Sequence, residues 1–331
     1  MSYLDRLWWA PSQDWVSGWL GPNQLPAGTP SGEVEDDTAY LNIFLRSARI
    51  VNVRRGLTRF YGAVHSYMRV PHRSRETAEF NVVTTPGELK NVDSGHLDRV
   101  IQTNERLLGP VPYAGGDLQM QIGLFSIAAA DLAAPYLSLL ETLSKTAGVS
   151  FITAALPFSA PILEGVRLLT GSNKDALEIG LSETQPQPRQ GFYVVMRAPK
   201  QAVSLSELRM DPADCRLADG DNRPVADFPY MVIEVRATSK RDDWFKIPEL
   251  GKAYAHVQDA YRENRRKDAD AAIDIFRRVA LTCNDLITSD AERVAEKVQS
   301  MYQEVGPPAP VQRGVSRAGT NILPDLSELQ L

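Results

Sequence analysis

Eight arginines in one short stretch are the residues of this chain best suited to chemistry. The stretch runs from Arg46 to Arg75, carries two histidines and contains no acidic residue. Guanidinium groups bind phosphate and carboxylate bidentately and stack on aromatic rings. The composition therefore predicts a face for an anionic partner, either nucleic acid or an acidic protein. The members of this arginine block are Arg46, Arg49, Arg54, Arg55, Arg59, Arg69, Arg73 and Arg75.

The arginine block is notable because the rest of the chain is acidic. The chain holds 36 Lys and Arg against 41 Asp and Glu, a net charge of −5. Without the eight arginines, 28 basic residues face 41 acidic ones, a net charge of −13. Phe60, Tyr61 and Tyr67 interleave with the arginines, which suits stacking on bases. The alternative is a sheet face neutralised inside the fold, for example by the acidic run 33–37.

The string closest to an enzyme site is Ile233-Glu234-Val235-Arg236, with Asp227 upstream. It loosely resembles the PD-(D/E)xK nucleases, in which an acid and a Glu-x-Lys pair hold a metal ion. Arg236 occupies the position of that Lys. The same alternation of apolar and charged residues is also that of an ordinary amphipathic strand. A metal-dependent nuclease centred on Glu234 is therefore an alternative hypothesis, with Asp227, Glu234 and Arg236 as its candidate catalytic residues.

Other reaction signatures are missing from the sequence. It has no dinucleotide-binding glycine motif, phosphate-binding loop, serine elbow or zinc-protease helix motif. Cys215 and Cys283 are far apart and have no metal-ligand spacing, so we expect reduced thiols and neither metal nor cofactor. The first residues lack a secretion leader. These observations favour a non-catalytic interaction or adaptor protein of a cytoplasmic assembly.

Both ends of the chain carry large apolar side chains that need a cover. Four of the five tryptophans lie within the first twenty residues, and aliphatic residues end the Pro- and Gly-rich tail. Tryptophan is a frequent anchor of protein interfaces, so we expect a protein partner or self-assembly. The alternatives are an arm that folds back on its own domain and a tail without a role. The candidate partner anchors are Trp8, Trp9, Trp15, Trp19, Leu326 and Leu329.

A long apolar segment, residues 118–163, offers a second alternative. It contains only three charged residues, and a membrane-spanning helix needs about 20 apolar residues. Prolines and glycines interrupt it, which is costly in lipid and favours a buried core. A membrane-associating effector that inserts this segment is kept as a less favoured hypothesis.

The elements that would position these residues form an α+β fold. Alternation from Leu41 predicts a strand, followed by strands over 57–70 and 80–83, so the arginines would lie on or beside a hairpin. We expect a helix over 97–108 and a loop over 109–116. Further strands are expected at 118–124, 176–182, 191–198 and 230–237, and helices at 131–147, 161–170, 248–264, 269–282 and 290–304. A capping box from Ser289 to Glu292 would begin the last helix.

The same patterns divide the chain into four parts. We expect a Trp-rich arm and linker over 1–37 and a β-rich domain with inserted helices over 38–237. A helical segment over 243–304 and a flexible tail with an apolar docking end over 305–331 follow.

Three short strings resemble uncharacterised bacterial proteins found near defence or conflict genes. They are Gly109-Pro-Val-Pro-Tyr113 with Gly115-Gly116, Gly123-Leu-Phe-Ser126 and Ala147-Gly-Val-Ser-Phe151. The likeness covers residues 39–170. It implies a bacterial chain with a role in antiviral defence, and it implies no activity, ligand or catalytic residue.

Overall fold

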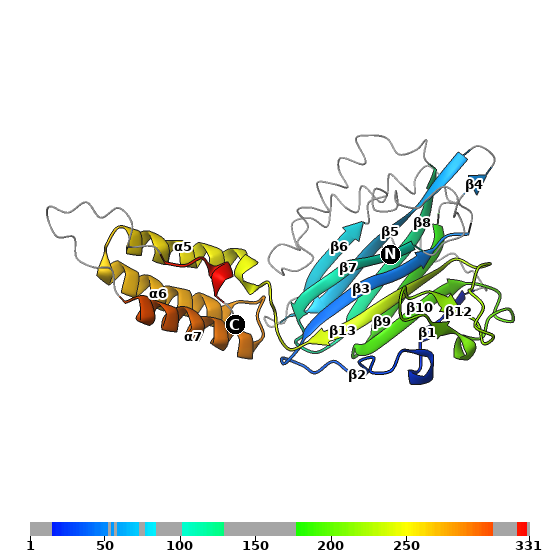
Figure 1. Ribbon diagram of the computed structural model, residues 1–331, viewed down its shortest axis with the longest axis horizontal. Helices are drawn as coiled ribbons and strands as arrows, with labels where there is room; N and C mark the ends of the chain where they lie inside the picture. Colours follow the sequence, from blue (N-terminus) through cyan, green and yellow to red (C-terminus); the bar gives the residue numbers. More distant parts are fainter. Residues whose placement is uncertain are drawn as a thin grey trace. The chain divides into compact units, whose positions relative to one another are not determined.

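The computed structural model describes residues 15–51, 54–55, 58–72, 77–83, 101–128, 177–306 and 323–329. The chain is α+β and divides into two compact units. The sheet unit comprises residues up to Asp36 and from Leu41 to Ala237. The helical unit comprises the short segment Asp37–Tyr40 and the residues from Thr238 onward. Figure 1 shows the strands of the first unit and the three helices of the second.

The larger sheet of the sheet unit has six strands. Their order is β1-β10-β13-β3-β7, with β2 paired to β10. β10 is antiparallel to β1, β2 and β13. Most residues of β3, β10 and β13 are buried, as expected for central strands rich in apolar residues. The strands are β1 (Trp15–Trp19), β2 (Gly32–Glu33), β3 (Tyr40–Arg49), β7 (Ile101–Pro112), β10 (Arg189–Arg197) and β13 (Tyr230–Thr238).

The second sheet has five strands in the order β4-β5-β8-β9, with β6 paired to β5. All of these pairings are antiparallel. Met68 of β5 faces Met120 of β8, and both side chains are fully buried. The strands are β4 (Arg54–Arg55), β5 (Thr58–Pro71), β6 (Thr77–Val83), β8 (Leu118–Ala128) and β9 (Leu177–Gln185). The strands of both sheets lie along the same diagonal in Figure 1.

One sequence-based expectation about this unit is confirmed and another is wrong. The arginines were expected on or beside a hairpin, and Arg54 and Arg55 of β4 pair with Arg59 and Thr58 of β5, while β3 pairs with β13 and β7. Residues 101–112, expected mostly as a helix and a loop, form strand β7. Its Gly109 has a φ of +100°, and a Cβ there would lie 2.3 Å from the carbonyl oxygen of Leu41. Close non-local pairing with β3 thus overrides the local helical spacing.

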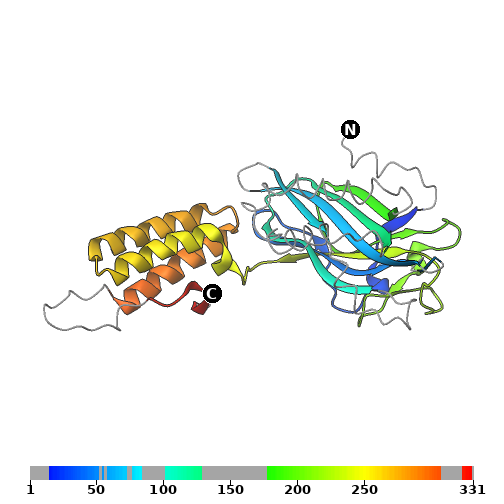
Figure 2. The same cartoon turned by 90° about the horizontal axis from the view of Figure 1, so that it is seen from above.

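The three C-terminal helices agree with their expected positions. α5 spans Pro248–Arg262, α6 Arg266–Thr282 and α7 Thr288–Val305. Residues at helical spacing are buried, among them Ile273 and Phe276 of α6 and Val294 and Val298 of α7. α6 packs against both other helices, and Figure 2 shows the three side by side. The expected helices 131–147 and 161–170 lie outside the described residues.

The expected capping box at Ser289 is wrong, because α7 begins two residues earlier than expected, with Ile287 as its N-cap, and no side chain caps it. Asp290 is instead fully buried and accepts hydrogen bonds from Tyr40 Oη at 2.8 Å and from Arg241 N at 3.0 Å. The backbone N–H of Ile287 donates to the same Tyr40 hydroxyl at 3.1 Å. Tyr40 therefore fixes the start of α7.

The N-terminal tryptophans that the structure describes lie on the chain's own sheet. Trp15 and Trp19 begin and end β1, which pairs with β10. The Trp19 ring meets Tyr193 edge-on at 5.4 Å, and the Arg189 guanidinium lies 5.6 Å from the Trp19 ring centroid. At Trp15 and Trp19, these contacts favour the alternative in which the arm folds back on its own domain, and they disfavour the role of partner anchor. Trp8 and Trp9 lie outside the described residues.

Candidate functional site

Three arginines from three neighbouring strands converge on the ring of Phe44. β3 lies between β13 and β7, and alternate residues of a strand share one face. The guanidinium carbons of Arg46 on β3, Arg106 on β7 and Arg236 on β13 lie 4.5, 5.4 and 6.0 Å from the Phe44 ring centroid. These distances are within the range of cation–π attraction. We call this set, with Glu234 and Asn104, the Phe44 cluster.

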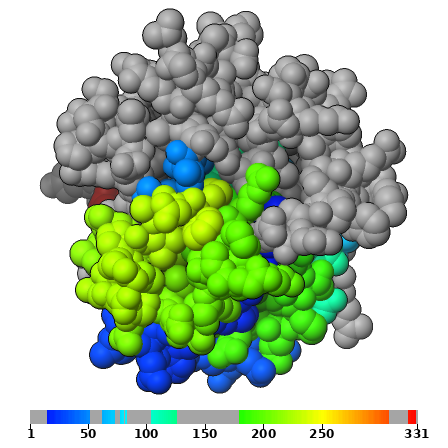
Figure 3. Space-filling view, turned by 90° about the vertical axis from the view of Figure 1, so that its right-hand side faces the viewer, coloured from blue at the N-terminus to red at the C-terminus, as the bar shows by residue number. Residues whose placement is uncertain are grey.

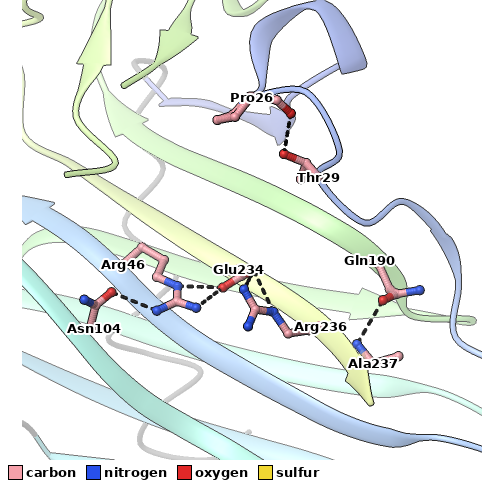
Figure 4. A network of polar contacts seen from close by, with 8 residues as sticks. All are labelled: Pro26, Thr29, Arg46, Asn104, Gln190, Glu234, Arg236 and Ala237. Carbon is pink, nitrogen blue, oxygen red and sulfur yellow. Dashed lines mark hydrogen bonds and ion pairs between the residues drawn. The ribbon is translucent and has the colours of Figure 1, made fainter. Parts of the chain in front are cut away.

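The buried carboxylate of Glu234 neutralises part of the positive charge of these arginines. Its side chain is 3% exposed, and each of its carboxylate oxygens serves one guanidinium. Arg46 Nε donates to Oε2 at 2.5 Å, and Arg236 donates to Oε1 from Nε at 3.0 Å and from Nη2 at 2.7 Å (Figure 4). A buried carboxylate is tolerated when it is paired in this way. Glu234 therefore fixes two arginines in place.

The remaining contacts make Arg46 the most confined arginine of the Phe44 cluster. Its Nη1 donates to Asn104 Oδ1 at 2.8 Å, and its side chain is 16% exposed. Arg236 is 43% exposed at its side chain despite the pair with Glu234. Arg106 is exposed and makes a long hydrogen bond of 3.4 Å to the carbonyl oxygen of Gly109. Two of the three guanidiniums can therefore be reached from solvent.

The described members of the Phe44 cluster carry three positive charges and one negative charge. This local excess of positive charge lies within a chain of net charge −5. Guanidiniums held in a fixed orientation match the oxygens of carboxylate and phosphate groups. The arrangement can therefore bind an anionic group without first ordering its own side chains.

The same face of the larger sheet has an apolar half. Phe192 of β10 is opposite Glu234, and Val194 and Met196 follow on the same face. They belong to a buried cluster with Leu208 and other residues of the segment 199–228, which we call the cover segment. The cover segment contains the short elements η6 (Leu205–Glu207), β11 (Arg209–Met210) and β12 (Leu217–Ala218). One half of this face is thus a covered core, and the other half carries the Phe44 cluster.

Cys215 of the cover segment lies beside the Phe44 cluster. Ser47 Oγ donates to the Cys215 carbonyl oxygen at 2.8 Å. Burial raises the pKa of the Cys215 thiol, and the nearby positive charge of Arg46 offsets this only in part. The thiol therefore stays protonated at neutral pH, which is the wrong state for a nucleophile.

A pocket of about 400 Å³ lies between residues 23–26 and the cover segment. The Gln24 side chain in its wall accepts a hydrogen bond from Gly21 N and donates to the carbonyl oxygens of Leu205 and Leu208. These contacts hold the cover segment against the N-terminal residues, and Figure 3 shows the two segments meeting on one face. The pocket thus marks a packing contact, and its polar groups serve the fold.

The structure distributes the predicted arginine block over both sheets. Arg46 belongs to the Phe44 cluster, and Arg49 is buried with its Nε donating to the Ala226 carbonyl oxygen at 3.0 Å. Arg69 lies on β5 of the other sheet and pairs with Glu79 at 3.5 Å. Arg54 and Arg55 form β4, where Arg54 is in register with Arg59 of β5. Arg73 and Arg75 lie outside the described residues.

From the sequence, Arg106 and Arg236 were not assigned to the arginine-rich face. Arg106 was expected on a helix, and Arg236 was interpreted as part of a nuclease motif. The signal that could have found them is a charged residue within an otherwise buried strand, as at Glu234 between Ile233 and Val235.

The nuclease candidates do not form a metal site in the described part of the chain. Glu234 is occupied by two guanidiniums, and Asp227 is exposed in the loop before β13. Within the described residues, one group of three side chains could hold a metal ion: Glu249, Cys283 and Asp285 of the helical unit. Burial and a hydrogen bond to Glu249 hold the pKa of the Cys283 thiol well above its usual range. A protonated thiol is a poor metal ligand.

The membrane hypothesis concerns residues 118–163. Its first eleven residues form strand β8 inside the second sheet, and residues 129–163 lie outside the described part. Among the helices that the structure describes, none has the length and hydropathy needed to cross a membrane.

The two candidate anchors of the tail, Leu326 and Leu329, are buried within the chain itself. They belong to the segment Leu323–Leu329, which includes the short helix η8 (Leu326–Glu328). The tail therefore docks on its own body here, which corrects the expectation that this whole region is flexible.

No protein-family model, curated protein or solved structure matches this chain. The resemblance to bacterial proteins near defence genes therefore stays a prediction.

Proposed function

We propose that this chain is a non-catalytic interaction protein of a cytoplasmic assembly that binds an acidic segment of a protein partner through the Phe44 cluster. The observation that carries this proposal is the convergence of Arg46, Arg106 and Arg236 on one ring, against the single carboxylate of Glu234. Carboxylate groups of the partner would pair with the exposed N–H groups of Arg106 and Arg236.

Preorganisation supports this function. Glu234 and Phe44 orient Arg236 before any partner arrives, and Asn104 helps to orient Arg46. Long side chains that are already ordered lose little conformational entropy on binding. Positive charge of this kind also steers an acidic partner toward the site and makes the association rate depend on salt.

An acidic protein segment is favoured over nucleic acid for two reasons. The Phe44 ring already contacts guanidiniums, which would compete with a nucleobase for stacking on it. The Phe44 cluster is also one compact site in an acidic chain, whereas nucleic-acid binding draws on many phosphate contacts along the backbone.

The experiment uses fluorescence polarisation with two labelled probes, a short polyglutamate peptide and a single-stranded oligothymidylate. The wild-type chain should bind the peptide, and Arg106→Glu with Arg236→Glu should weaken binding at least about tenfold, a loss of about 1.4 kcal/mol. Arg277→Glu is the matched control, because Arg277 is exposed on α6 of the other unit.

Three results would overturn the proposal. They are equal peptide binding by the double variant, an equal loss in the Arg277 control, and tighter binding of the oligonucleotide with a steep salt dependence. The last result would assign the Phe44 cluster to phosphate recognition instead.

A further inference from the structure

The guanidinium of Arg106 is positioned on the Phe44 ring without a carboxylate partner in the described part of the chain. Its carbon lies 5.4 Å from the ring centroid, and its Nη1 makes only the long contact of 3.4 Å with the Gly109 carbonyl oxygen. Arg106 is exposed, so Nε and Nη2, which form the other edge of the group, can be reached from solvent. Two N–H groups on one edge of a guanidinium can hold a carboxylate bidentately.

Arg236 offers a different donor. Its Nε and Nη2 already donate to Glu234 Oε1, at 3.0 and 2.7 Å, so this edge of the guanidinium is occupied. Its Nη1 makes no hydrogen bond with the described residues, and the side chain is 43% exposed. Arg46 is more confined, because each of its three nitrogens is already hydrogen bonded or ion paired. The Phe44 cluster therefore presents two guanidiniums to a ligand, those of Arg106 and Arg236.

These two guanidiniums come from strands on opposite sides of β3. β7 and β13 both neighbour β3, so the two backbones are roughly 10 Å apart. Distances of 5.4 and 6.0 Å from one ring limit the separation of the two guanidinium carbons to at most 11.4 Å. A ligand that pairs with both must therefore carry two carboxylates within this reach, and it must run across the strands.

The charge of the Phe44 cluster fits two carboxylates. Three positive charges and the one negative charge of Glu234 leave a net charge of +2. The chain as a whole has a net charge of −5, so a longer acidic run would bring further carboxylates toward an acidic surface. Charge complementarity therefore favours a ligand with two acidic groups.

We infer that the Phe44 cluster recognises an acidic-x-acidic motif in an extended segment of the partner, with one carboxylate on Arg106 and the other on Arg236. This inference rests on the proposed function and specifies its partner. Alternate side chains of an extended segment point the same way and are about 7 Å apart, whereas adjacent side chains point in opposite directions. Residues i and i+2 thus present both carboxylates to the site, and the residue between them points to solvent.

The test compares three labelled peptides of equal length and equal charge by fluorescence polarisation. Each carries two glutamates in a Gly-Ser background, where they are adjacent, separated by one serine or separated by five serines. The wild-type chain should bind the peptide with one intervening serine at least about fivefold more tightly than the other two, because the second contact is lost or weakened when the spacing does not fit. Polyglutamate is measured in parallel as the probe of the proposed function.

Arg106→Gln and Arg236→Gln test whether the two guanidiniums act as a pair. With either one removed, the site keeps a single contact, so the three peptides should bind alike. Arg277→Gln is the matched control, because Arg277 is exposed on α6 of the helical unit, and it should keep the fivefold preference. Circular dichroism verifies that each variant is folded, and the comparison of peptides on the wild-type chain does not depend on any variant.

The inference is overturned if the wild-type chain binds polyglutamate but does not distinguish the three peptides. Survival of the preference in a folded Arg106→Gln or Arg236→Gln chain would also overturn it. In both cases the proposed function stands. Failure of the wild-type chain to bind polyglutamate would instead overturn the proposed function together with this inference, so the two failures are distinguishable.

Discussion

Glu234 and Arg46 form an ion pair in which Arg46 Nε lies 2.5 Å from Glu234 Oε2, although the carboxylate is 3% exposed. The pair joins the two central strands β3 and β13 across the face that carries the Phe44 cluster. Its partner Arg236 occupies the other carboxylate oxygen. A single acid thus determines where two of the three positive charges lie.

Replacing Glu234 by Gln should therefore destabilise the sheet unit by about 3 kcal/mol, because a buried amide would face two guanidiniums with no charge to balance them. The measurement is urea unfolding followed by circular dichroism. Arg236→Gln, which changes the more exposed partner, should cost less than about 1 kcal/mol. A metal ligand would behave in the opposite way: Glu234→Gln would preserve stability and abolish metal-dependent cleavage.

Phe276→Ala should destabilise the helical unit by about 3–5 kcal/mol, because this side chain is 1% exposed and packs against the Tyr254 ring at 6.0 Å. The neighbouring residue provides the control. Ile275 is 48% exposed, so Ile275→Ala should change stability by no more than about 0.5 kcal/mol. Thermal unfolding of both variants measures the contrast, and similar losses would mean that α6 packs through a different face.

Gly109→Ala should be strongly destabilising, by about 3 kcal/mol or more, because its backbone has a positive φ and its Cβ would collide with the Leu41 carbonyl oxygen. Gly251→Ala in α5 is the counterpart. A Cβ at Gly251 meets nothing within 4 Å, so this change should stabilise the protein by about 0.5–1 kcal/mol. Chemical denaturation of both variants tests the pair, and a neutral Gly109→Ala would contradict the close approach of β7 to β3.

Stability should fall as the pH rises from about 10 to about 12, and Tyr230 should contribute to the fall. Burial raises the pKa of Tyr230 from 10.0 to about 12, so folding favours the neutral phenol. Its contribution is complete below the pKa of the unfolded chain and is lost as the pH passes through the folded value. Tyr230→Phe should therefore show a shallower decline in urea midpoint across this range. Parallel declines in the variant and the wild type would show that other groups carry the effect.

Much of the fold could be predicted because its signals are local. The α5–α7 helices and the strands β8, β9, β10 and β13 follow apolar spacing that is visible within a single segment. β7 could not be predicted in this way. Its residues Leu107 and Leu108 suit a helix locally, and only the pairing of β7 with β3 makes them neighbours of the sheet core.

The sequence was enough to predict an arginine-rich site, but it was not enough to predict which arginines form it. An arginine-rich face was expected, and Arg46 belongs to it. The other two guanidiniums, Arg106 and Arg236, are distant in sequence and meet only because β3 lies between β7 and β13. Arginines that are close in sequence were therefore expected in one site, although residues such as Arg69 lie on the other sheet and do not belong to the Phe44 cluster.

The hydrogen bonds of Tyr40 bear on how this protein can be dissected. Tyr40 lies in sequence between the two parts of the sheet unit, yet its hydroxyl donates to Asp290 and accepts from the backbone N–H of Ile287, both in the helical unit. A fragment beginning at Thr238 would lack this hydroxyl, so the backbone N–H of Ile287 would lose its acceptor and Asp290 would lose one of its donors at the start of α7. In modular terms, the sheet residues Leu41–Ala237 are inserted between two parts of the helical unit, and transplanting the helices into another protein requires that Asp37–Tyr40 travel with them.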